Sequence, residues 1–408
     1  MKLKIFVGLI VVFLLAGGCA PGRDFDTRLD SIVKPDVFSL AQWQSMALIR
    51  ELSQNTPESP ENTGREIEMI TEYFSATGRI KALKAAIDAT STGNAEHDAS
   101  SLEVELNALQ ARKEALKDGV ERIIERQIAE AMAGQGIFNP VTAAEFTFPP
   151  VNFKLEELPY LLVISPRERI ESIREITLKP GLTLEEIENI EARADELEIS
   201  SLVMGIGGLG VTYPTLVTSD AGLRFTLEAV AEEWLHQYLA FKPLGFLYLL
   251  DLTGLSPNYE IAIMNETTAG MVSKEIGAIV YQKYYSEYEQ DAGRKPVAEI
   301  NSDFNLEMRE IRKTVDDYLS RGEVEQAEDF MEQKRQYLSS LGYHIRKLNQ
   351  AYFAFHGAYG DSPTSISPIG LELRQLRSQS ASLKDFLNTA AALTSRQKLK
   401  DSLQQTAQ

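Results

Sequence analysis

The stretch AEEWLHQYL, residues 231–239, sets three ionisable side chains on one turn of a predicted helix. Residues four apart lie on one face of an α-helix, so Glu232 and His236 point the same way and Glu233 lies beside them. A glutamate and a histidine at this spacing are a competent pair of metal ligands. The alternative is simpler: the two glutamates belong to a solvated helix face, and His236 is an ordinary core histidine.

Two further segments flank this helix. Downstream, MNETTAG (residues 264–270) places Asn265 and Glu266 on a long helix predicted over 258–284. Upstream, SSLVMGIGGLGVTYPTLVT (residues 200–218) is typical of a strand, a glycine-rich turn and a second strand. Its glycines match G-x-G-x-x-G, but Pro214 and two valines follow where a dinucleotide site requires a helix to begin. We therefore expect a hairpin turn and no dinucleotide.

The order of a strand pair, a helix with E-x-x-H and a later helix with Asn-Glu resembles the gluzincin (thermolysin-like) class of zinc metallopeptidases. The resemblance implies that Glu233 is the general base, His236 a metal ligand and Glu266 another. It also implies that VTYPTLV (residues 211–217) forms the edge that binds the substrate backbone.

A later segment, LNQAYFAFHGAYGDSP (residues 348–363), resembles a helix of bacterial aminopeptidase-like proteins with an Asn-x-Ala…Tyr pattern, here Asn349, Ala351 and Tyr359. Tyr352, His356 and Tyr359 are predicted on one helical face, from which any of them could reach an oxyanion. We name Tyr359 as the candidate catalytic tyrosine; the alternative for all three is aromatic packing.

The chain departs from the gluzincin pattern at two linked positions. Glu232 stands where the first ligand histidine is expected, and Gly270 stands where an aspartate normally orients that histidine. In one interpretation the site is rebuilt as an O,N,O centre of Glu232, His236 and Glu266. Two anionic ligands would weaken the pull of zinc on bound water and favour harder metals such as manganese. In the other interpretation the metal is lost and the carboxylates repel one another, which raises at least one pKa.

The N-terminus, MKLKIFVGLIVVFLLAGGCA, resembles a bacterial lipoprotein signal. Lys2 and Lys4 precede an apolar run over residues 5–15, which is too short to span a bilayer, and small residues lead to Cys19, the only cysteine. Ala16 stands where the usual leucine is expected. An ordinary secretory signal or a short membrane anchor is the alternative. We expect a lipid on Cys19 and a folded part on the extracytoplasmic face of the bacterial membrane or envelope.

The composition limits the remaining possibilities. A chain of 408 residues can bury a large core without disulfides. A net charge of −18 argues against nucleic acid as a partner. We predict a predominantly helical α+β fold in which a helical hairpin precedes a gluzincin-like domain with a small β-sheet. The expected parts are a signal peptide (1–18), a tether (19–36), a helical hairpin arm (37–135), the gluzincin-like domain (140–365), and C-terminal helices with a frayed tail (366–408).

Two functional hypotheses follow. The first is a lipid-anchored, zinc-dependent peptidase with an altered or degenerate metal site, acting on peptides or proteins. The second is a non-catalytic envelope lipoprotein that binds peptides or a protein partner, either at the VTYPTLV edge or through the helical arm. The first requires that Glu232, His236 and Glu266 converge on one point, because a metal is excluded if they do not.

Overall fold

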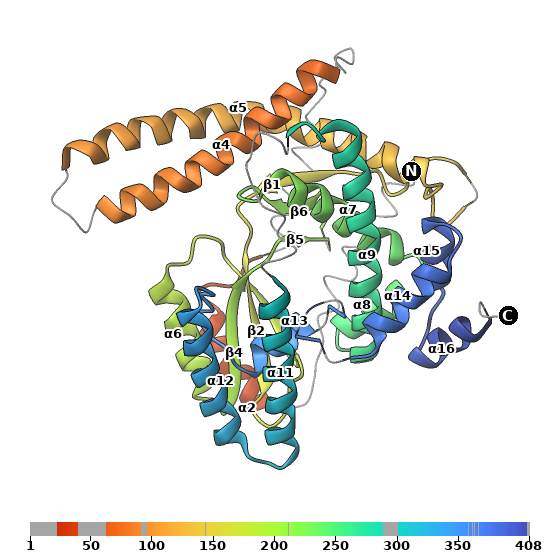
Figure 1. The fold of residues 1–408 in the computed structure, drawn as a ribbon. Helices are drawn as coiled ribbons and strands as arrows, with labels where there is room; N and C mark the ends of the chain where they lie inside the picture. Colours follow the sequence, from red (N-terminus) through yellow and green to blue (C-terminus); the bar gives the residue numbers. More distant parts are fainter. Residues whose placement is uncertain are drawn as a thin grey trace.

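The computed structural model describes residues 23–39, 63–90, 96–142, 144–210, 212–288, 301–357, 359–360, 362, 364–365 and 367–405. The protein is α+β and predominantly helical, as predicted, with two small sheets among many helices (Figure 1). The predicted signal peptide and Cys19 lie outside the described residues. Among the described residues, no helix is both long enough and apolar enough to cross a bilayer.

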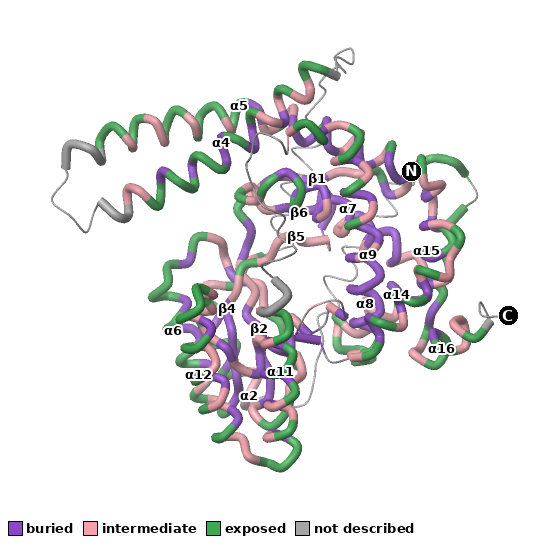
Figure 2. The backbone as a smooth tube through the Cα atoms, viewed as in Figure 1, coloured by how far each residue is buried: buried purple, intermediate pink, exposed green. Residues whose placement is uncertain are grey.

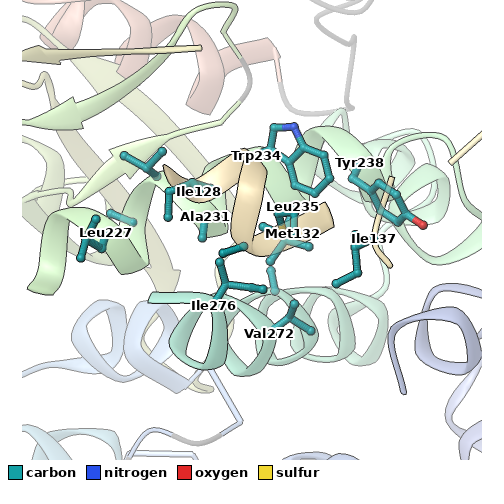
Figure 3. Close-up of a cluster of buried hydrophobic side chains, with 14 of the residues drawn as sticks. Ile128, Met132, Ile137, Leu227, Ala231, Trp234, Leu235, Tyr238, Val272 and Ile276 are labelled. Atoms are coloured by element: carbon teal, nitrogen blue, oxygen red, sulfur yellow. The ribbon is translucent and has the colours of Figure 1, made fainter. Parts of the chain in front are cut away.

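The main core is built on helices α5 (Glu96–Gly134), α7 (Leu223–Leu239) and α9 (Tyr259–Tyr284) (Figure 3). Helix α7 contains neither glycine nor proline and is rich in leucine, alanine and glutamate, which favour helix. The Asn258 side chain caps α9 by accepting a hydrogen bond from the Ile261 N–H at 3.2 Å. Leu227, Ala231, Trp234, Leu235 and Tyr238 of α7 are buried in this core. Their burial fixes the opposite side of α7 toward the candidate site.

Helix α4 (Thr63–Thr90) packs against α5 as the predicted helical hairpin. Figure 2 shows mostly exposed or partly exposed residues along the end of this hairpin that projects from the molecule. Ion pairs between exposed side chains, such as Arg79 with Glu105, join the two helices there. The C-terminal half of α5 instead lies in the main core through Ile128 and Met132. The predicted arm is therefore continuous with the body, and residues 40–62 of it lie outside the described part.

The strands form two three-stranded sheets, where the sequence led us to expect one. In the first sheet, β2 (Tyr160–Pro166) lies between β3 (Arg174–Leu178) and β4 (Ile199–Gly205), and both pairings are antiparallel. In the second, β6 (Thr215–Thr218) lies between β1 (Phe153–Glu156), to which it is parallel, and the short antiparallel β5 (Gly208–Leu209).

The predicted hairpin over residues 200–218 is consequently wrong. Strand β4 pairs with β2, whereas β6 pairs with β1, so the two strands belong to different sheets. The glycine-rich segment between them carries its own strand, β5, which forms the hairpin with β6. Only long-range pairing decides which strands are partners, and local turn signals do not report it.

Glutamate side chains of α5 accept hydrogen bonds from N–H groups on the outer edge of strand β1. Glu121 of α5 accepts hydrogen bonds from the Leu155 N–H (2.8 Å) and from the Lys154 ammonium (3.0 Å). Glu125 accepts a hydrogen bond from the Phe153 N–H at 3.0 Å. An exposed strand edge is a template for pairing with another chain, and this edge is closed by α5.

A second core joins α2 (Arg23–Val33) and α6 (Leu184–Asp195) to the first sheet. Leu29, Ile32 and Val33 of α2 are buried in it. The sequence predicts a tether over residues 19–36, whereas the part of it from Arg23 onward is mainly a packed helix. The apolar residues four and three apart on α2 are the signal for this amphipathic helix.

The other face of the first sheet is covered by α13 (Gln350–Gly357), and α11 (Asn301–Ser320) and α12 (Val324–Ser340) form a helical pair that shares a core with α13. Three helices, α14 (Ile369–Gln379), α15 (Leu383–Ala391) and α16 (Arg396–Gln405), follow and pack on the side of α9 (Figure 1). Part of the polar C-terminal tail that was expected to fray instead forms α16, whose Leu399 is fully buried.

Candidate metal centre

Helices α7 and α9 bring three candidate metal ligands together. Atoms of Glu232, His236 and Glu266 all lie within 4.8 Å of one another. A point therefore exists within about 2.8 Å of all three atoms (4.8 Å divided by √3), against ligand distances of about 2.0–2.2 Å at zinc. Side-chain shifts of less than an ångström would complete such a site. The three residues named from the sequence thus form a group that could hold a metal ion.

The donor atoms available to a cation can be identified for two of these residues. The Tyr248 hydroxyl, on helix α8 (Pro243–Leu252), donates a hydrogen bond of 2.5 Å to Glu266 Oε1. This leaves Glu266 Oε2, which lies 3.7 Å from His236 Nε2. Glu266 would consequently bind a cation through one oxygen, opposite the His236 Nε2 atom.

Asn265 orients the His236 ring from behind. Its side-chain amide lies 3.0 Å from His236 Nδ1, and Asn265 is buried. With the amide nitrogen placed toward the ring, the buried Asn265 Oδ1 has no hydrogen-bond partner. Exchanging the amide oxygen and nitrogen, which are indistinguishable by shape, lets Oδ1 accept the Nδ1–H proton. That arrangement frees the Nε2 lone pair for a metal, as second-shell partners of ligand histidines commonly do.

A pair of tyrosines surrounds Glu266. Tyr359 follows α13, and the negative charge of the nearby Glu266 carboxylate, with burial, raises the pKa of Tyr359 well above its usual value. Burial and Glu266 likewise raise the pKa of Tyr248. Both hydroxyls therefore remain protonated donors at neutral pH. Tyr359 lies at the site, as predicted. Tyr248 was not identified from the sequence, because α8 reads only as an apolar run and its place beside Glu266 depends on tertiary packing.

Glu233 lies against Gly208 of strand β5 and against Gly210, which follows that strand. A Cβ atom added to Gly208 would lie 2.0 Å from Glu233 Oε1, and one added to Gly210 would lie 2.5 Å from Oε2. Both glycines therefore leave room for the same carboxylate. The glycine-rich segment therefore makes space for the Glu233 carboxylate, although its spacing matches the G-x-G-x-x-G motif of dinucleotide-binding sites.

Glu233 has an electrostatically unfavourable environment. Burial, then the negative charges of Glu232 and Glu266, raises its pKa well above the usual value for glutamate. Strand β3 of the other sheet carries Glu175, which is exposed by surface area and whose raised pKa includes a contribution from the negative charge of Glu266. The acidic side chains that converge here come from α7 and α9. A bound cation would lower the electrostatic cost of this arrangement.

The substrate-binding edge implied by the resemblance is placed differently by the structure. VTYPTLV leads into β6, which is the central strand of its sheet, and both of its edges are occupied by β1 and β5. The outer strand next to Glu233 is β5. The prediction that VTYPTLV forms this edge is therefore wrong, because the two-residue strand Gly208–Leu209 was too short and too rich in glycine to be recognised.

Gly270 of α9 faces Glu232 across the helix pair. A Cβ atom added at Gly270 would lie 3.6 Å from Glu232 Oε1, at ordinary contact distance. A larger residue at 270 would thus reach the side chain at 232. The two positions at which the chain departs from the gluzincin pattern are neighbours in space.

The remaining residues of the segment 348–363 serve the packing of α13. The Asn349 Oδ1 atom accepts a hydrogen bond from the Tyr352 N–H, and its Nδ2 donates to the Ser201 carbonyl of β4. The Tyr352 and His356 rings lie 4.3 Å apart, and burial lowers the pKa of His356 to about 4. Because α13 ends at Gly357, Tyr359 does not continue the helical face of Tyr352 and His356, as had been predicted.

No protein-family model, no curated protein and no solved structure matches the chain.

Proposed function

We propose that the protein is a metal-dependent peptidase with a gluzincin-like scaffold and an altered metal site, anchored by a lipid on Cys19 to the extracytoplasmic face of the bacterial envelope. The observation that carries the proposal is the convergence of Glu232, His236 and Glu266, with Glu233 alongside. This combination supports the proposal, because the metal group and the adjacent carboxylate lie at the positions that carry the ligands and the general base in the peptidase pattern, with Glu232 in place of a histidine.

The chain's own residues match the tasks of peptide hydrolysis. A bound divalent cation would supply a Lewis acid that polarises a carbonyl and lowers the pKa of water. Glu233 is a carboxylate with a raised pKa beside Gly208 and Gly210, which makes it a stronger proton acceptor than an ordinary glutamate. Tyr359 and Tyr248 keep their hydroxyl protons and lie at Glu266, so they are candidate donors to a developing oxyanion.

The donor set influences the choice of metal. Two carboxylate oxygens and one imidazole nitrogen are harder than the two imidazoles and one carboxylate of a gluzincin. Zinc is accommodated by either set, but oxygen-rich ligation shifts the relative preference toward manganese. We therefore propose zinc or manganese as the cofactor, with slower hydrolysis than a site with two histidines would give.

The second candidate function is a non-catalytic envelope lipoprotein that binds peptides or a protein partner. The observation that favours it is Glu232 itself, which places a charge where peptidases of this pattern carry a neutral ligand. Under this alternative the scaffold persists without turnover, and the metal group is a remnant.

Digestion of a peptide library decides between the two. The protein is loaded with zinc or manganese and incubated with the library, and the products are read by mass spectrometry. The proposal predicts cleavage that Glu233→Gln abolishes, because the amide cannot accept a proton, while bound metal is retained. Metal bound at one ion per chain without cleavage under any loading would reject the peptidase and leave the binding protein.

A further inference from the structure

A groove of about 480 Å³ lies between strand β4, helix α6, the segment 344–347 and helix α13. The floor and walls are largely apolar or aromatic, and Leu184 and Ile345 remain accessible to solvent. The side chains used in the argument are Leu184, Ile187, Met204, Ile345, Tyr352 and His356. The groove is not needed by the metal group, whose ligands come from α7 and α9.

The backbone of β4 along this groove is already paired. Side chains of α6 and of residues 346–349 take up its outward N–H and C=O groups. These bonds are Ser201 N–H to Asp195 Oδ1 (2.9 Å), Val203 N–H to Glu191 Oε1 (2.6 Å), Asn349 Nδ2 to the Ser201 carbonyl (2.8 Å) and Arg346 Nη2 to the Val203 carbonyl (2.8 Å). A ligand in the groove consequently cannot add a strand to β4 there. Recognition must depend on buried side-chain surface.

The groove offers little free charge, although basic residues line it. Arg346 binds Glu191 through two nitrogens, at 2.6 and 2.8 Å, and Lys347 binds Asp195 at 2.8 Å. The His356 ring packs on Tyr352 with centroids 4.3 Å apart, which places it among aromatic groups. Since both long cations are paired with carboxylates, the chemistry of the groove favours an apolar group over an anion.

Two chain segments connect the groove to the candidate site. Gly205 lines the groove, and Gly208, which meets the Glu233 carboxylate, is three residues further on. His356 lines the groove, and Tyr359, whose pKa is raised by the neighbouring Glu266 carboxylate, is also three residues further on. Three residues span at most about 10–11 Å of backbone. An extended peptide of about three or four residues would bridge the same distance.

From this geometry we infer that the groove is a subsite that holds an apolar side chain of an extended peptide, about three or four residues from the segment seated at Glu233 and the metal group. The inference rests on the proposed function for the nature of the ligand, a peptide, and adds the class of side chain that the ligand carries. The subsite recognises that side chain but forms no strand pairing with the peptide backbone. The outward N–H and C=O groups of Ser201 and Val203 in β4 already form hydrogen bonds with side chains.

Binding of a defined peptide series tests this subsite apart from catalysis. The probes are fluorescein-labelled decapeptides of alanine and serine, each with a single leucine at a successive position, and binding to the metal-free full-length protein is measured by fluorescence anisotropy. We expect affinity to peak at one leucine position. Leu184→Glu, at a residue 57% exposed, should weaken that peak about tenfold or more. Leu371→Glu, at a residue 65% exposed on α14, is the matched control and should leave the peak unchanged.

The outcomes separate the subsite from the peptidase proposal. A leucine-position peak that Leu184→Glu removes and Leu371→Glu retains supports the subsite, even if no metal loading yields cleavage. Equal affinity at every leucine position, equal loss in both variants, or no binding to any of the peptides overturns it. The assay measures peptide binding to the metal-free protein. Its result therefore does not depend on whether the metal-loaded protein hydrolyses peptides.

Discussion

Glu232 and Gly270 are the two residues in which the chain departs most clearly from a zinc peptidase, and they face each other in the structure. A histidine at 232 would be a neutral ligand, and an aspartate at 270 would be placed to orient it. The contact distance of 3.6 Å between a Cβ at 270 and Glu232 Oε1 leaves room for this pair.

The combined variant Glu232→His with Gly270→Asp should therefore bind zinc more tightly than the natural protein. We expect a gain of about tenfold or more, the size of typical effects of orienting partners on metal affinity. Competition with a chromophoric chelator measures it, and Glu232→His alone is the comparison, with a smaller gain expected. Unchanged or weaker zinc binding in the combined variant would argue against the gluzincin-like geometry.

Gly208 tests whether the glycine strand makes room for Glu233. Gly208→Ala places a methyl group 2.0 Å from Glu233 Oε1, so it should destabilise the fold by about 1–3 kcal/mol. Glu233→Ala should recover most of that loss in the double variant, because the clashing carboxylate is gone. Urea denaturation gives the free energies of unfolding.

The matched control for that cycle is Gly205→Ala. Nothing lies within 4 Å of a Cβ added at Gly205, so its cost should be small and independent of Glu233. Additive effects of Gly208→Ala and Glu233→Ala would show that the two residues do not compete for space.

At the site, the sequence was sufficient to identify residues that helix periodicity places on one face. Glu232 and His236 share a helical face, and Glu266 follows from the resemblance; the structure brings all three together. It was insufficient for Tyr248, since no local pattern relates α8 to α7. It also could not assign a role to Asn265, because the His236 contact depends on how two helices pack.

Among the elements, α16 shows most directly how local polarity misleads. Its sequence is polar enough to suggest a frayed tail, yet a single apolar residue, Leu399, is fully buried in the main core. Leu399→Ala should cost about 2–4 kcal/mol of unfolding free energy, through lost burial and a residual cavity.

Leu371→Ala is the control for this element, since that leucine is 65% exposed and its loss should cost less than about 0.5 kcal/mol. Both values come from urea denaturation. Similar values for the two variants would mean that α16 does not dock on the core in solution.

Helices and strands differ in how far the sequence could predict them. Helix α9 lies within a residue of its predicted range, 258–284, because periodicity along a helix is a local property. The existence of β4 and β6 was also predicted, but their partners were not. Strand partners depend on contacts far apart in the chain, and the sequence of the glycine-rich segment contains no signal for them.

At the scale of the whole molecule, acid should weaken the fold partly through His356. Burial lowers its pKa from 6.5 to about 4, so the folded state holds the neutral ring more strongly than the unfolded chain does. The associated stability is complete above about pH 6.5 and is lost as the pH falls from there toward 4. Between pH 7 and pH 5 the loss should reach at most about 2 kcal/mol, with screening by solvent reducing it.

Removing the titrating ring isolates this contribution. His356→Gln should lose less unfolding free energy between pH 7 and pH 5 than the natural protein does. His344→Gln, at an exposed histidine, should follow the natural protein. Identical pH dependence in the natural protein and His356→Gln would exclude His356 as a source of acid sensitivity.

The central claim for the molecule is that α7 and α9 form a metal centre, and metal content is its most direct measure. The full-length protein and His236→Ala are loaded with zinc and with manganese, dialysed, and measured by inductively coupled plasma mass spectrometry. We predict about one metal ion per natural chain and its loss in His236→Ala, because the single imidazole ligand is removed. An absence of metal from the natural protein after both loadings, or equal metal in both proteins, would contradict the account.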